Sequence, residues 1–210
     1  MGQNLLSEEL WIERFDNLAA DDYLVIDGFM DRENYESLRF YFDQKKNQND
    51  FESAGIGALS KHQINKSVRG DFIHWISRIE DPLTIPYFDT IDELVGLLKR
   101  YCFLSISDYE FHMAHYPIGS FYKKHLDQFN DRNNRLISCV FYLNENWKPA
   151  DGGQLKLFLN DEEKLVEPMA NRLVIFKSDT LWHEVLPTTS GRDSITGWLL
   201  FQPKGLGFLS

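Results

Sequence analysis

The second half of the chain is a succession of short runs that are rich in β-branched and aromatic residues. Asn, Asp and Gly separate the runs, and these are the residues that tight turns between strands require. Regularly spaced short strands favour a closed double sheet, whose mouth can hold a small ligand. We therefore predict a mainly β fold, with a double-stranded β-helix (jelly-roll) core supported by N-terminal helices. The expected strands are residues 109–115, 135–143, 154–159, 171–176, 182–186 and 193–202.

The first half of the chain carries helical patterns instead. Apolar residues recur at helical spacing, and Asp31 precedes one such segment as a plausible N-cap. Periodicity is weak between residues 48 and 70, which predicts either a long mobile loop or an irregular hairpin, and loops of that length are often functional. A chain of 210 residues fits one domain, with residues 1–105 as helical support and entrance loop and residues 106–203 as the β core. The expected helices are residues 6–17, 31–47 and 91–101, and residues 23–27 are an expected strand.

Charge and hydropathy exclude several classes of partner. The formal net charge is −10 and the chain has no basic stripe, which argues against nucleic acid because phosphate contacts depend on clustered Lys and Arg. No apolar run approaches membrane-spanning length, and the first residues lack the features of a signal peptide. We expect a soluble cytoplasmic protein that is a monomer or weak homodimer. Cys102 and Cys139 lie in apolar surroundings and are expected to be buried, reduced thiols.

His125, Asp127 and His183 suggest a metal site. Two imidazoles and one carboxylate are the protein ligands of non-haem iron(II) sites that keep open positions for other ligands. Residues two apart in an extended segment share a face, so His125 and Asp127 can point at one ion. Each part alone is weak, since a lone His-x-Asp is usually a surface hydrogen-bonded pair and a lone histidine is more often a core residue. Zinc accepts the same ligands, but hydrolysis would need Glu184 as general base, and its strand position points away from His183.

A polar stripe follows on the strand that begins after Gly191. A period of two places Arg192, Ser194, Thr196 and Trp198 on one face of this otherwise apolar strand. Buried polar groups need polar partners, and a bound carboxylate would pair with the guanidinium through two parallel hydrogen bonds. In residues 136–142 the same period puts Ser138 and Tyr142 on one face, so the Tyr142 phenol could join Arg192 in binding the carboxylate. The alternative is an internal salt bridge from Arg192 to an Asp or Glu.

Together these residues resemble the prolyl 4-hydroxylases of the 2-oxoglutarate- and iron(II)-dependent oxygenase superfamily, over about residues 106–203. Upstream, Arg69-Gly70-Asp71-x-x-x-Trp75 resembles a segment of the oxygen-sensing prolyl hydroxylase branch and its bacterial relatives. The residues that carry the core resemblance are Tyr116-Pro117, Tyr122, His125-x-Asp127, Arg135, Phe141-Tyr142-Leu143-Asn144, Trp147, Gly152-Gly153, Phe176, His183-Glu184-Val185 and Gly191-Arg192-x-Ser194-x-Thr196-x-Trp198.

The resemblance implies roles for the individual residues. Iron(II) would be held by His125, Asp127 and His183, and the distal carboxylate of 2-oxoglutarate would lie on Arg192 and Tyr142. The other implied cosubstrate contacts are Thr196 nearby, Tyr116 at the keto-acid end and Trp198 at the base of the pocket, although Trp198 is as readily a plain core aromatic. Arg69, Asp71 and Trp75 would shape the peptide entrance, and Arg135 would contact substrate or pair with an acid.

The implied reaction is hydroxylation of a prolyl residue in a cytosolic protein, with O2 as oxidant, ascorbate as reductant, and succinate and carbon dioxide as co-products. Two alternatives stay open. The same chemistry could act on a free amino acid or a non-prolyl side chain, although residues 48–75 are long enough to clamp a peptide. A non-catalytic binding or sensor module on the same barrel is the other alternative, and all three ligands and the arginine argue against it.

Overall fold

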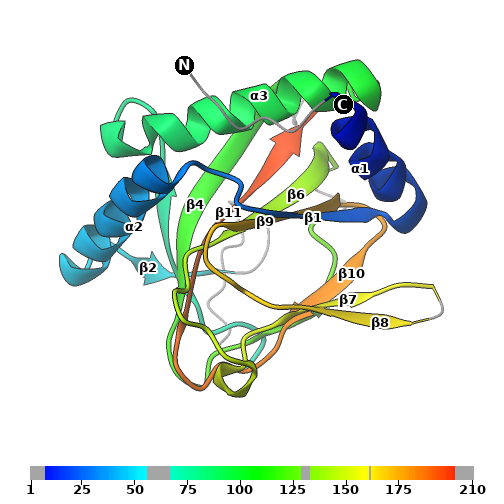
Figure 1. The fold of residues 1–210 in the computed structure, drawn as a ribbon. Helices are drawn as coiled ribbons and strands as arrows, with labels where there is room; N and C mark the ends of the chain where they lie inside the picture. Colours follow the sequence, from blue (N-terminus) through cyan, green and yellow to red (C-terminus); the bar gives the residue numbers. More distant parts are fainter. Residues whose placement is uncertain (1–7, 56–66, 129–132, 161, 202–210) are drawn as a thin grey trace.

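Two antiparallel β-sheets face each other in the computed structural model, which describes residues 8–55, 67–128, 133–160 and 162–201 (Figure 1). The larger sheet has the strand order β1-β9-β6-β11-β4-β3-β2, and the smaller has the order β5-β10-β7-β8. The strands are β1 (Tyr23–Asp27), β2 (Glu52–Ser53), β3 (Phe72–Ile76), β4 (Asp108–Tyr116), β5 (Tyr122–His125), β6 (Arg135–Tyr142), β7 (Leu155–Phe158), β8 (Glu163–Val166), β9 (Arg172–Lys177), β10 (Trp182–Val185) and β11 (Arg192–Leu200). This arrangement confirms the predicted jelly-roll core.

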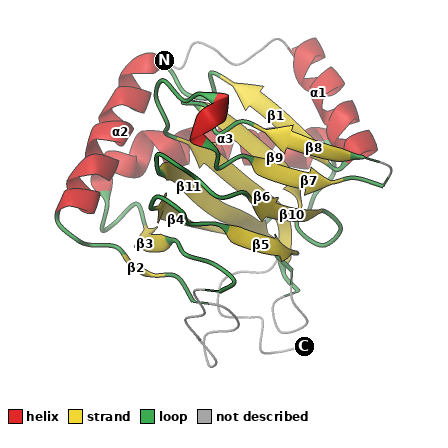
Figure 2. Ribbon diagram, turned by 90° about the horizontal axis from the view of Figure 1, so that it is seen from below, coloured by secondary structure: helices red, strands yellow, loops and turns green. Residues whose placement is uncertain are grey.

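The helices cover one face of the larger sheet and leave its other face to the smaller sheet (Figure 1). Helix α3 crosses the outer face, with α1 and α2 on either side of it, and Figure 2 shows the four-stranded sheet on the opposite side. The helices are α1 (Glu8–Asp21), α2 (Arg32–Asn47) and α3 (Ile85–Tyr101), with short 3-10 turns η2 (Pro82–Thr84) and η3 (Pro149–Asp151). No helix in the described part of the chain is long and apolar enough to cross a membrane.

Strand alternation divides the interior into two apolar layers. In β4, Phe111 and Met113 point into the layer between the sheet and the helices, whereas Ala114 and Tyr116 point between the two sheets. The layer against the helices is large and aromatic, and the layer between the sheets is smaller. Because the second layer is lined by the inward faces of β4, β6 and β11, every inward polar side chain of these strands faces the same interior.

Most elements begin and end close to where the sequence predicts them. Strand β1 occupies the predicted residues 23–27, and helix α2 follows its predicted N-cap, because the Asp31 side chain accepts a hydrogen bond from the Asn34 N–H. Helix α3 begins at Ile85, six residues before the predicted start at residue 91. Its first turn contains Pro86, which is tolerated there because the first helical N–H groups lack intrahelical partners.

Four strands are absent from the sequence prediction. Strands β5 and β8 lie at the two edges of the smaller sheet, where β5 has no buried side chain and β8 has only Val166, so they lack the apolar alternation that marks a strand. Strand β2 lies within the segment 48–70 and β3 begins just after it, and the two pair antiparallel at one edge of the larger sheet, as the irregular-hairpin alternative predicts. Residues 56–66 of that segment lie outside the described residues. Cys139 is buried as predicted, but the prediction for Cys102 is wrong, because it is only half-buried beyond the end of α3.

Candidate active site

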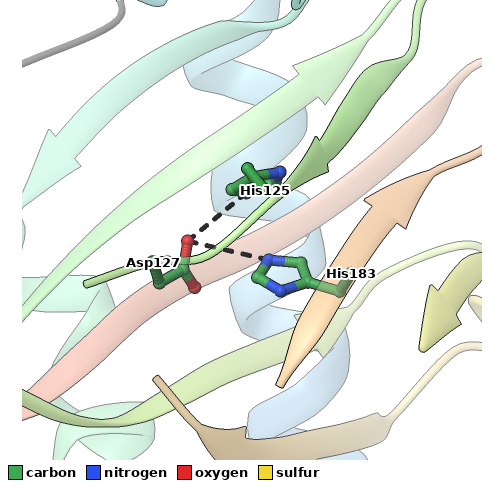
Figure 3. A group of neighbouring side chains, drawn as sticks. All are labelled: His125, Asp127 and His183. Carbon is green, nitrogen blue, oxygen red and sulfur yellow. Dashed lines mark ion pairs between the residues drawn. The ribbon is translucent and has the colours of Figure 1, made fainter. Parts of the chain in front are cut away.

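Two strands of the smaller sheet bring His125, Asp127 and His183 together (Figure 3). His125 ends β5 and lies directly opposite His183 in β10, while Asp127 follows two residues after His125. The Asp127 Oδ1 atom lies 3.4 Å from His125 Nε2 and 3.6 Å from His183 Nε2. One ligand atom from each residue lies within 4.8 Å of the other two, which is close enough for all three to bind one ion.

Hydrogen bonds to backbone carbonyl groups orient both imidazoles. His125 Nδ1 lies 2.7 Å from the Lys123 carbonyl oxygen, and His183 Nδ1 lies 3.0 Å from the Leu181 carbonyl oxygen. A carbonyl oxygen only accepts, so each Nδ1 carries a proton, and Nε2 is the ring nitrogen that faces Asp127 and is placed to bind a metal. Burial, followed by the nearby His125, lowers the pKa of His183 to about 4, against the opposing charge of Asp127. The His183 ring is therefore neutral at neutral pH, and both rings are oriented to present Nε2 to a metal.

Asp127 is a buried carboxylate that is held from behind. Burial by itself raises the pKa of Asp127, but His183, the hydrogen bond with His125 and the charge of Arg135 together hold it well below its usual range. Its Oδ2 atom accepts a hydrogen bond of 2.6 Å from Ser138, and its backbone carbonyl accepts one of 3.0 Å from Arg135. The carboxylate is therefore ionised and fixed before any metal binds.

Arg192 lies in the same interior, at the start of β11. The residue is 2% exposed, and its guanidinium carbon lies 4.9 Å from the ring centroids of both Tyr116 and Tyr142. Arg192 Nε and the Tyr142 hydroxyl are buried without a hydrogen-bond partner among the described residues. A single long contact of 3.3 Å joins the guanidinium to Ser194, whose hydroxyl lies 3.3 Å from that of Thr196.

The predicted alternative of an internal salt bridge at Arg192 is wrong for the described part of the chain. Arg69 pairs with Asp71 and Arg135 pairs with Glu110, but no described carboxylate pairs with Arg192. A buried guanidinium beside a buried unpartnered phenol costs free energy unless a ligand supplies acceptors. Burial also raises the pKa of Tyr142, while Arg192 opposes that rise, so the phenol is neutral and can donate to a carboxylate.

Known proteins share this fold along most of the chain. The family described as the 2OG-Fe(II) oxygenase superfamily matches residues 111–200. Egl nine homolog 1 of Rattus norvegicus is 30% identical over an alignment of 190 residues, and the match covers 83% of this chain and 54% of that protein. The crystal structure of a Pseudomonas putida prolyl-4-hydroxylase is 35% identical with a TM-score of 0.82, covering 91% of this chain and 98% of that one. This chain belongs to the prolyl 4-hydroxylase family of the 2-oxoglutarate- and iron(II)-dependent oxygenase superfamily.

A second oxygenase structure extends the likeness. The prolyl hydroxylase of Trichoplax adhaerens, solved in complex with a hypoxia inducible factor oxygen degradation domain peptide, is 26% identical with a TM-score of 0.83, covering 92% of this chain and 90% of that one. The chain spans about half the length of the rodent and human Egl nine homologues that it matches. The predicted family is therefore confirmed across nearly the whole chain, including the region before residue 106.

The residues present fit the metal and cosubstrate of the oxygenase family. Two neutral imidazoles and one ionised carboxylate are the donor set of a non-haem iron(II) site with open positions. The unpartnered Arg192 Nε and Tyr142 hydroxyl are two buried polar groups that one end of a dicarboxylate would satisfy. Glu184 does not supply a general base to the metal, because it lies on the other face of β10 with its carboxylate 3.7 Å from Lys156 Nζ.

The predicted entrance residues are linked to the metal site through stacked side chains. Arg69 and Asp71 form a two-pronged ion pair, with Arg69 Nε 2.7 Å from Asp71 Oδ1. The Arg69 guanidinium lies 4.4 Å from the centroid of the Tyr122 ring, which in turn stacks on His125 at 3.6 Å. A pocket of about 370 Å³ lies beside this ion pair and is also lined by Ser53, Ala54, Gly70, Phe72 and residues 117–121.

The structure places the remaining predicted residues as follows. Trp75 is 43% exposed at the end of β3, as an entrance residue should be. Of the two roles predicted for Arg135, pairing with an acid is the one present, because its guanidinium bonds Glu110 at 2.9 Å and stacks 3.3 Å from the Trp198 ring centroid. Trp198 is thus packed in the interior against Arg135 and His112, a position that fits both roles predicted for it. Trp182 is 45% exposed, on the outer side of the smaller sheet.

Sequence reasoning gives no role to Ser138, Tyr122 or His112, although each contacts the site or its walls. The period of two puts Ser138 on the same face as Tyr142, so the sequence did indicate that Ser138 points into the interior where it bonds Asp127. His112 shares the inward face of β4 with Tyr116, and its Nδ1 atom is buried without a partner among the described residues. Burial, with Arg69 next, lowers the pKa of His112 to about 3, so the ring is neutral.

Proposed function

We propose that this oxygenase hydroxylates a prolyl residue of a cytoplasmic protein, using iron(II), 2-oxoglutarate and O2. The proposal depends on one observation: the three ligand residues share an interior with Arg192 Nε and the Tyr142 hydroxyl, two buried polar groups that have no hydrogen-bond partner among the described residues. Identity of 35% to a prolyl-4-hydroxylase along 91% of the chain supports the prolyl substrate. Ascorbate would act as reductant, and the protein would work as a monomer or weak homodimer.

In this proposal His125, Asp127 and His183 bind the iron, and Arg192 and Tyr142 bind the distal carboxylate of 2-oxoglutarate. Tyr116, Thr196 and Trp198 complete the wall of the cosubstrate pocket. When bound, the iron and 2-oxoglutarate supply the oxidant that turns a C–H bond into C–OH, with one atom of O2 in the hydroxyl group and the other in succinate beside released carbon dioxide.

The protein's own contribution is position and exclusion of water. The backbone carbonyls behind His125 and His183 fix which ring nitrogen faces the metal, and Ser138 fixes which oxygen of Asp127 does. The neutral Tyr142 hydroxyl and the charged Arg192 hold the cosubstrate from its far end, so that its keto-acid end reaches the iron. The apolar layer between the sheets keeps the interior dry.

The substrate would enter beside Arg69, Asp71 and Trp75. The ion pair of Arg69 with Asp71 faces the pocket of about 370 Å³, and the Arg69 side chain continues through Tyr122 to His125. The Trichoplax adhaerens prolyl hydroxylase binds a peptide fragment of hypoxia inducible factor, which supports an extended peptide as substrate here. Residues 1–105 would then supply helical support and this entrance, and residues 106–203 the catalytic core.

The proposal is tested by incubating the purified protein with iron(II), 2-oxoglutarate, ascorbate and a lysate of its own source. Peptides are then searched by mass spectrometry for one added oxygen on proline, and succinate is measured in parallel. The Asp127→Ala protein serves as the control, so that any modified site must depend on the metal centre. Added oxygen only on other side chains, or on free amino acids, would favour the alternative substrates. An absence of succinate with a folded, iron-loaded protein would overturn the oxygenase function itself.

A further inference from the structure

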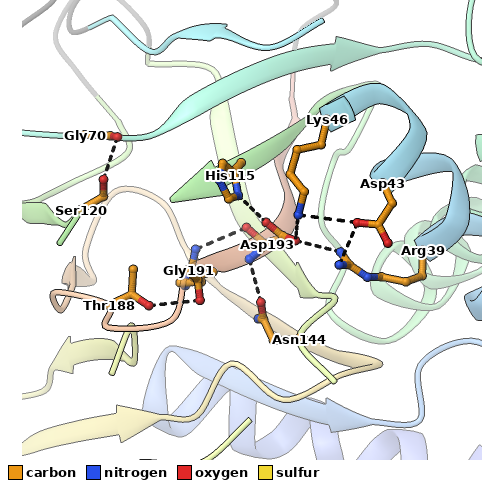
Figure 4. A network of polar contacts seen from close by, with 12 residues as sticks. Arg39, Asp43, Lys46, Gly70, His115, Ser120, Asn144, Thr188, Gly191 and Asp193 are labelled. Carbon is orange, nitrogen blue, oxygen red and sulfur yellow. Dashed lines mark hydrogen bonds and ion pairs between the residues drawn. The ribbon is translucent and has the colours of Figure 1, made fainter. Parts of the chain in front are cut away.

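Asp193, the neighbour of Arg192, is a buried carboxylate that a lysine, an arginine and a histidine hold on the opposite side of β11 (Figure 4). Its Oδ1 atom lies 2.6 Å from His115 Nδ1 on β4. Its Oδ2 atom lies 2.8 Å from Lys46 Nζ and 2.9 Å from an Arg39 guanidinium nitrogen, and both of these residues lie on α2. The carboxylate therefore joins the start of β11 to a helix of the N-terminal half and to the adjacent strand.

The backbone of Asp193 is fixed as firmly as its side chain. Its N–H donates a 2.7 Å hydrogen bond to the Asn144 side-chain oxygen, and its carbonyl accepts a 3.1 Å hydrogen bond from the Leu143 N–H. Just before it, Gly191 has a φ of 89°, a conformation that glycine adopts without strain, and its carbonyl accepts from the Thr188 hydroxyl. The start of β11 is thus held on both sides, immediately around Arg192.

The Arg192 side chain, by contrast, makes few polar contacts, although it is packed between the rings of Tyr116 and Tyr142. Its contact with the Ser194 hydroxyl is long, at 3.3 Å, and its Nε atom has no partner among the described residues. Gly153 leaves room for its stem, because a Cβ added there would lie 3.2 Å from Arg192 Cδ. The backbone of Arg192 consequently sets the position of the guanidinium between Tyr116 and Tyr142. Because adjacent residues of a strand point to opposite faces, Asp193 and Arg192 lie on opposite sides of β11. Fixing Asp193 outside the barrel fixes Arg192 inside it.

We propose, resting on the proposed function, that Asp193 is a positioning residue for Arg192, and that α2 belongs to the cosubstrate site through Lys46 and Arg39. The competing explanation is that the Asp193 cluster only ties α2 to the sheet. Both explanations predict a loss of stability when Asp193 is changed. Only the positioning role predicts a selective loss of affinity for 2-oxoglutarate, since the three metal ligands lie outside β11.

Asp81 provides a matched control, because it is also a buried carboxylate that ties down α2. It accepts a 2.7 Å hydrogen bond from the Tyr41 hydroxyl and a 2.9 Å bond from the Ser77 N–H, without contacting β11. Asp81→Asn should loosen the same helix and leave 2-oxoglutarate binding unchanged. A purely structural cluster at Asp193 would make Asp193→Asn behave in the same way as Asp81→Asn.

The experiment measures binding of Mn²⁺ alone, and then of 2-oxoglutarate to the Mn²⁺-loaded protein, by calorimetry, with folding checked by circular dichroism. For Asp193→Asn we expect about five- to tenfold weaker 2-oxoglutarate binding and unchanged Mn²⁺ affinity. Lys46→Met removes one cation, leaves the carboxylate two partners, and should weaken 2-oxoglutarate binding about twofold to threefold even if Asp193→Asn does not fold.

The outcomes separate this inference from the proposed function. If Arg192→Ala loses 2-oxoglutarate while folded Asp193→Asn and Lys46→Met bind it as the wild type does, the positioning role is overturned and the cosubstrate site stands. If Arg192→Ala also binds 2-oxoglutarate as the wild type does, both are overturned. Equal losses in Asp81→Asn and Asp193→Asn would likewise overturn the positioning role, because the effect would then follow α2 and not Arg192.

Discussion

The Ser138 hydroxyl donates a 2.6 Å hydrogen bond to Asp127 Oδ2, which leaves Asp127 Oδ1 as the carboxylate oxygen that faces both histidines. The Ser138 hydroxyl also lies 2.9 Å from that of Ser178, so the serine is itself held in place. One carboxylate oxygen is thereby committed to the protein and the other is kept for the metal. In the proposed site Asp127 would therefore bind iron through a single oxygen, which would leave more coordination positions open for other ligands.

Ser138→Ala should weaken iron(II) binding about tenfold or more while the three ligands stay in place, because supporting hydrogen bonds of this kind typically contribute ~10- to 100-fold to metal affinity. The measurement is anaerobic titration of the metal-free protein with iron(II). Ser107→Ala is a suitable control, since that hydroxyl makes a 3.4 Å contact with the Leu200 carbonyl, far along the chain from the metal ligands. Equal iron affinity in the Ser138 variant and the wild type would remove Ser138 from the site.

Asp127→Ala should abolish iron-dependent conversion of 2-oxoglutarate to succinate in a protein that remains folded. Asp127 supplies the only anionic ligand of the set, and its loss leaves two neutral imidazoles. Succinate production and circular dichroism are measured together, with Asp179→Ala as control, because Asp179 is an exposed carboxylate in the turn before β10. Succinate at the wild-type rate in Asp127→Ala would argue that the metal lies elsewhere.

Arg192→Ala should raise the 2-oxoglutarate requirement sharply. A charge-assisted pair in a buried site contributes on the order of 2–3 kcal/mol, which corresponds to roughly a 30- to 150-fold change in binding. Arg192→Lys should recover part of this, since it restores the charge without the two-pronged geometry. The 2-oxoglutarate dependence of succinate formation checks both variants. If neither variant changes that dependence, the cosubstrate carboxylate binds at another place.

The metal ligands and the arginine could be predicted from the sequence because local rules carry them. A period of two places His125 with Asp127 and Arg192 with Ser194, and turn residues mark where their strands begin. The N-cap at Asp31 follows from the same kind of local chemistry. What these rules leave out is the partner of each group. The bonds that join Arg39 to Asp193 and Arg135 to Glu110 cross 154 and 25 residues of sequence, and only the folded sheet brings them together.

The strands that escaped prediction share one physical property. The edge strand β5, with the sequence Tyr-Lys-Lys-His, has no buried side chain, so its pairing with β10 depends on backbone pairing and on the contact of the His125 ring with that of His183. Apolar periodicity reports burial, and a strand that buries little gives little signal. His125, at the end of β5, therefore lies on a strand that the apolar pattern of the sequence does not mark.

Gly197 and Gly96 should respond to alanine in opposite directions. A Cβ at Gly197 would lie 2.1 Å from the Glu110 carbonyl oxygen and 2.3 Å from a Phe111 ring carbon, so β11 and β4 would have to separate. Gly197→Ala is expected to destabilise the fold by about 3 kcal/mol. Gly96 lies inside α3 with open space around it, so Gly96→Ala should stabilise by about 1 kcal/mol. Urea unfolding of both variants measures the two changes.

Asp193 should make the free energy of unfolding depend on pH in the acid range. Burial raises the pKa of Asp193, but His115, Lys46 and Arg39 together hold it well below its usual range. A carboxyl of an unfolded chain titrates near about pH 4, so below that pH the unfolded state binds a proton that the native state does not. The stabilisation from Asp193 is therefore complete above about pH 5 and is lost progressively as the pH falls below about 4. Urea unfolding of metal-free wild type and Asp193→Asn across this range should give a stability difference that is largest near neutral pH and shrinks in acid. A difference that stays constant with pH would mean that the carboxyl is not held as an anion by these three partners.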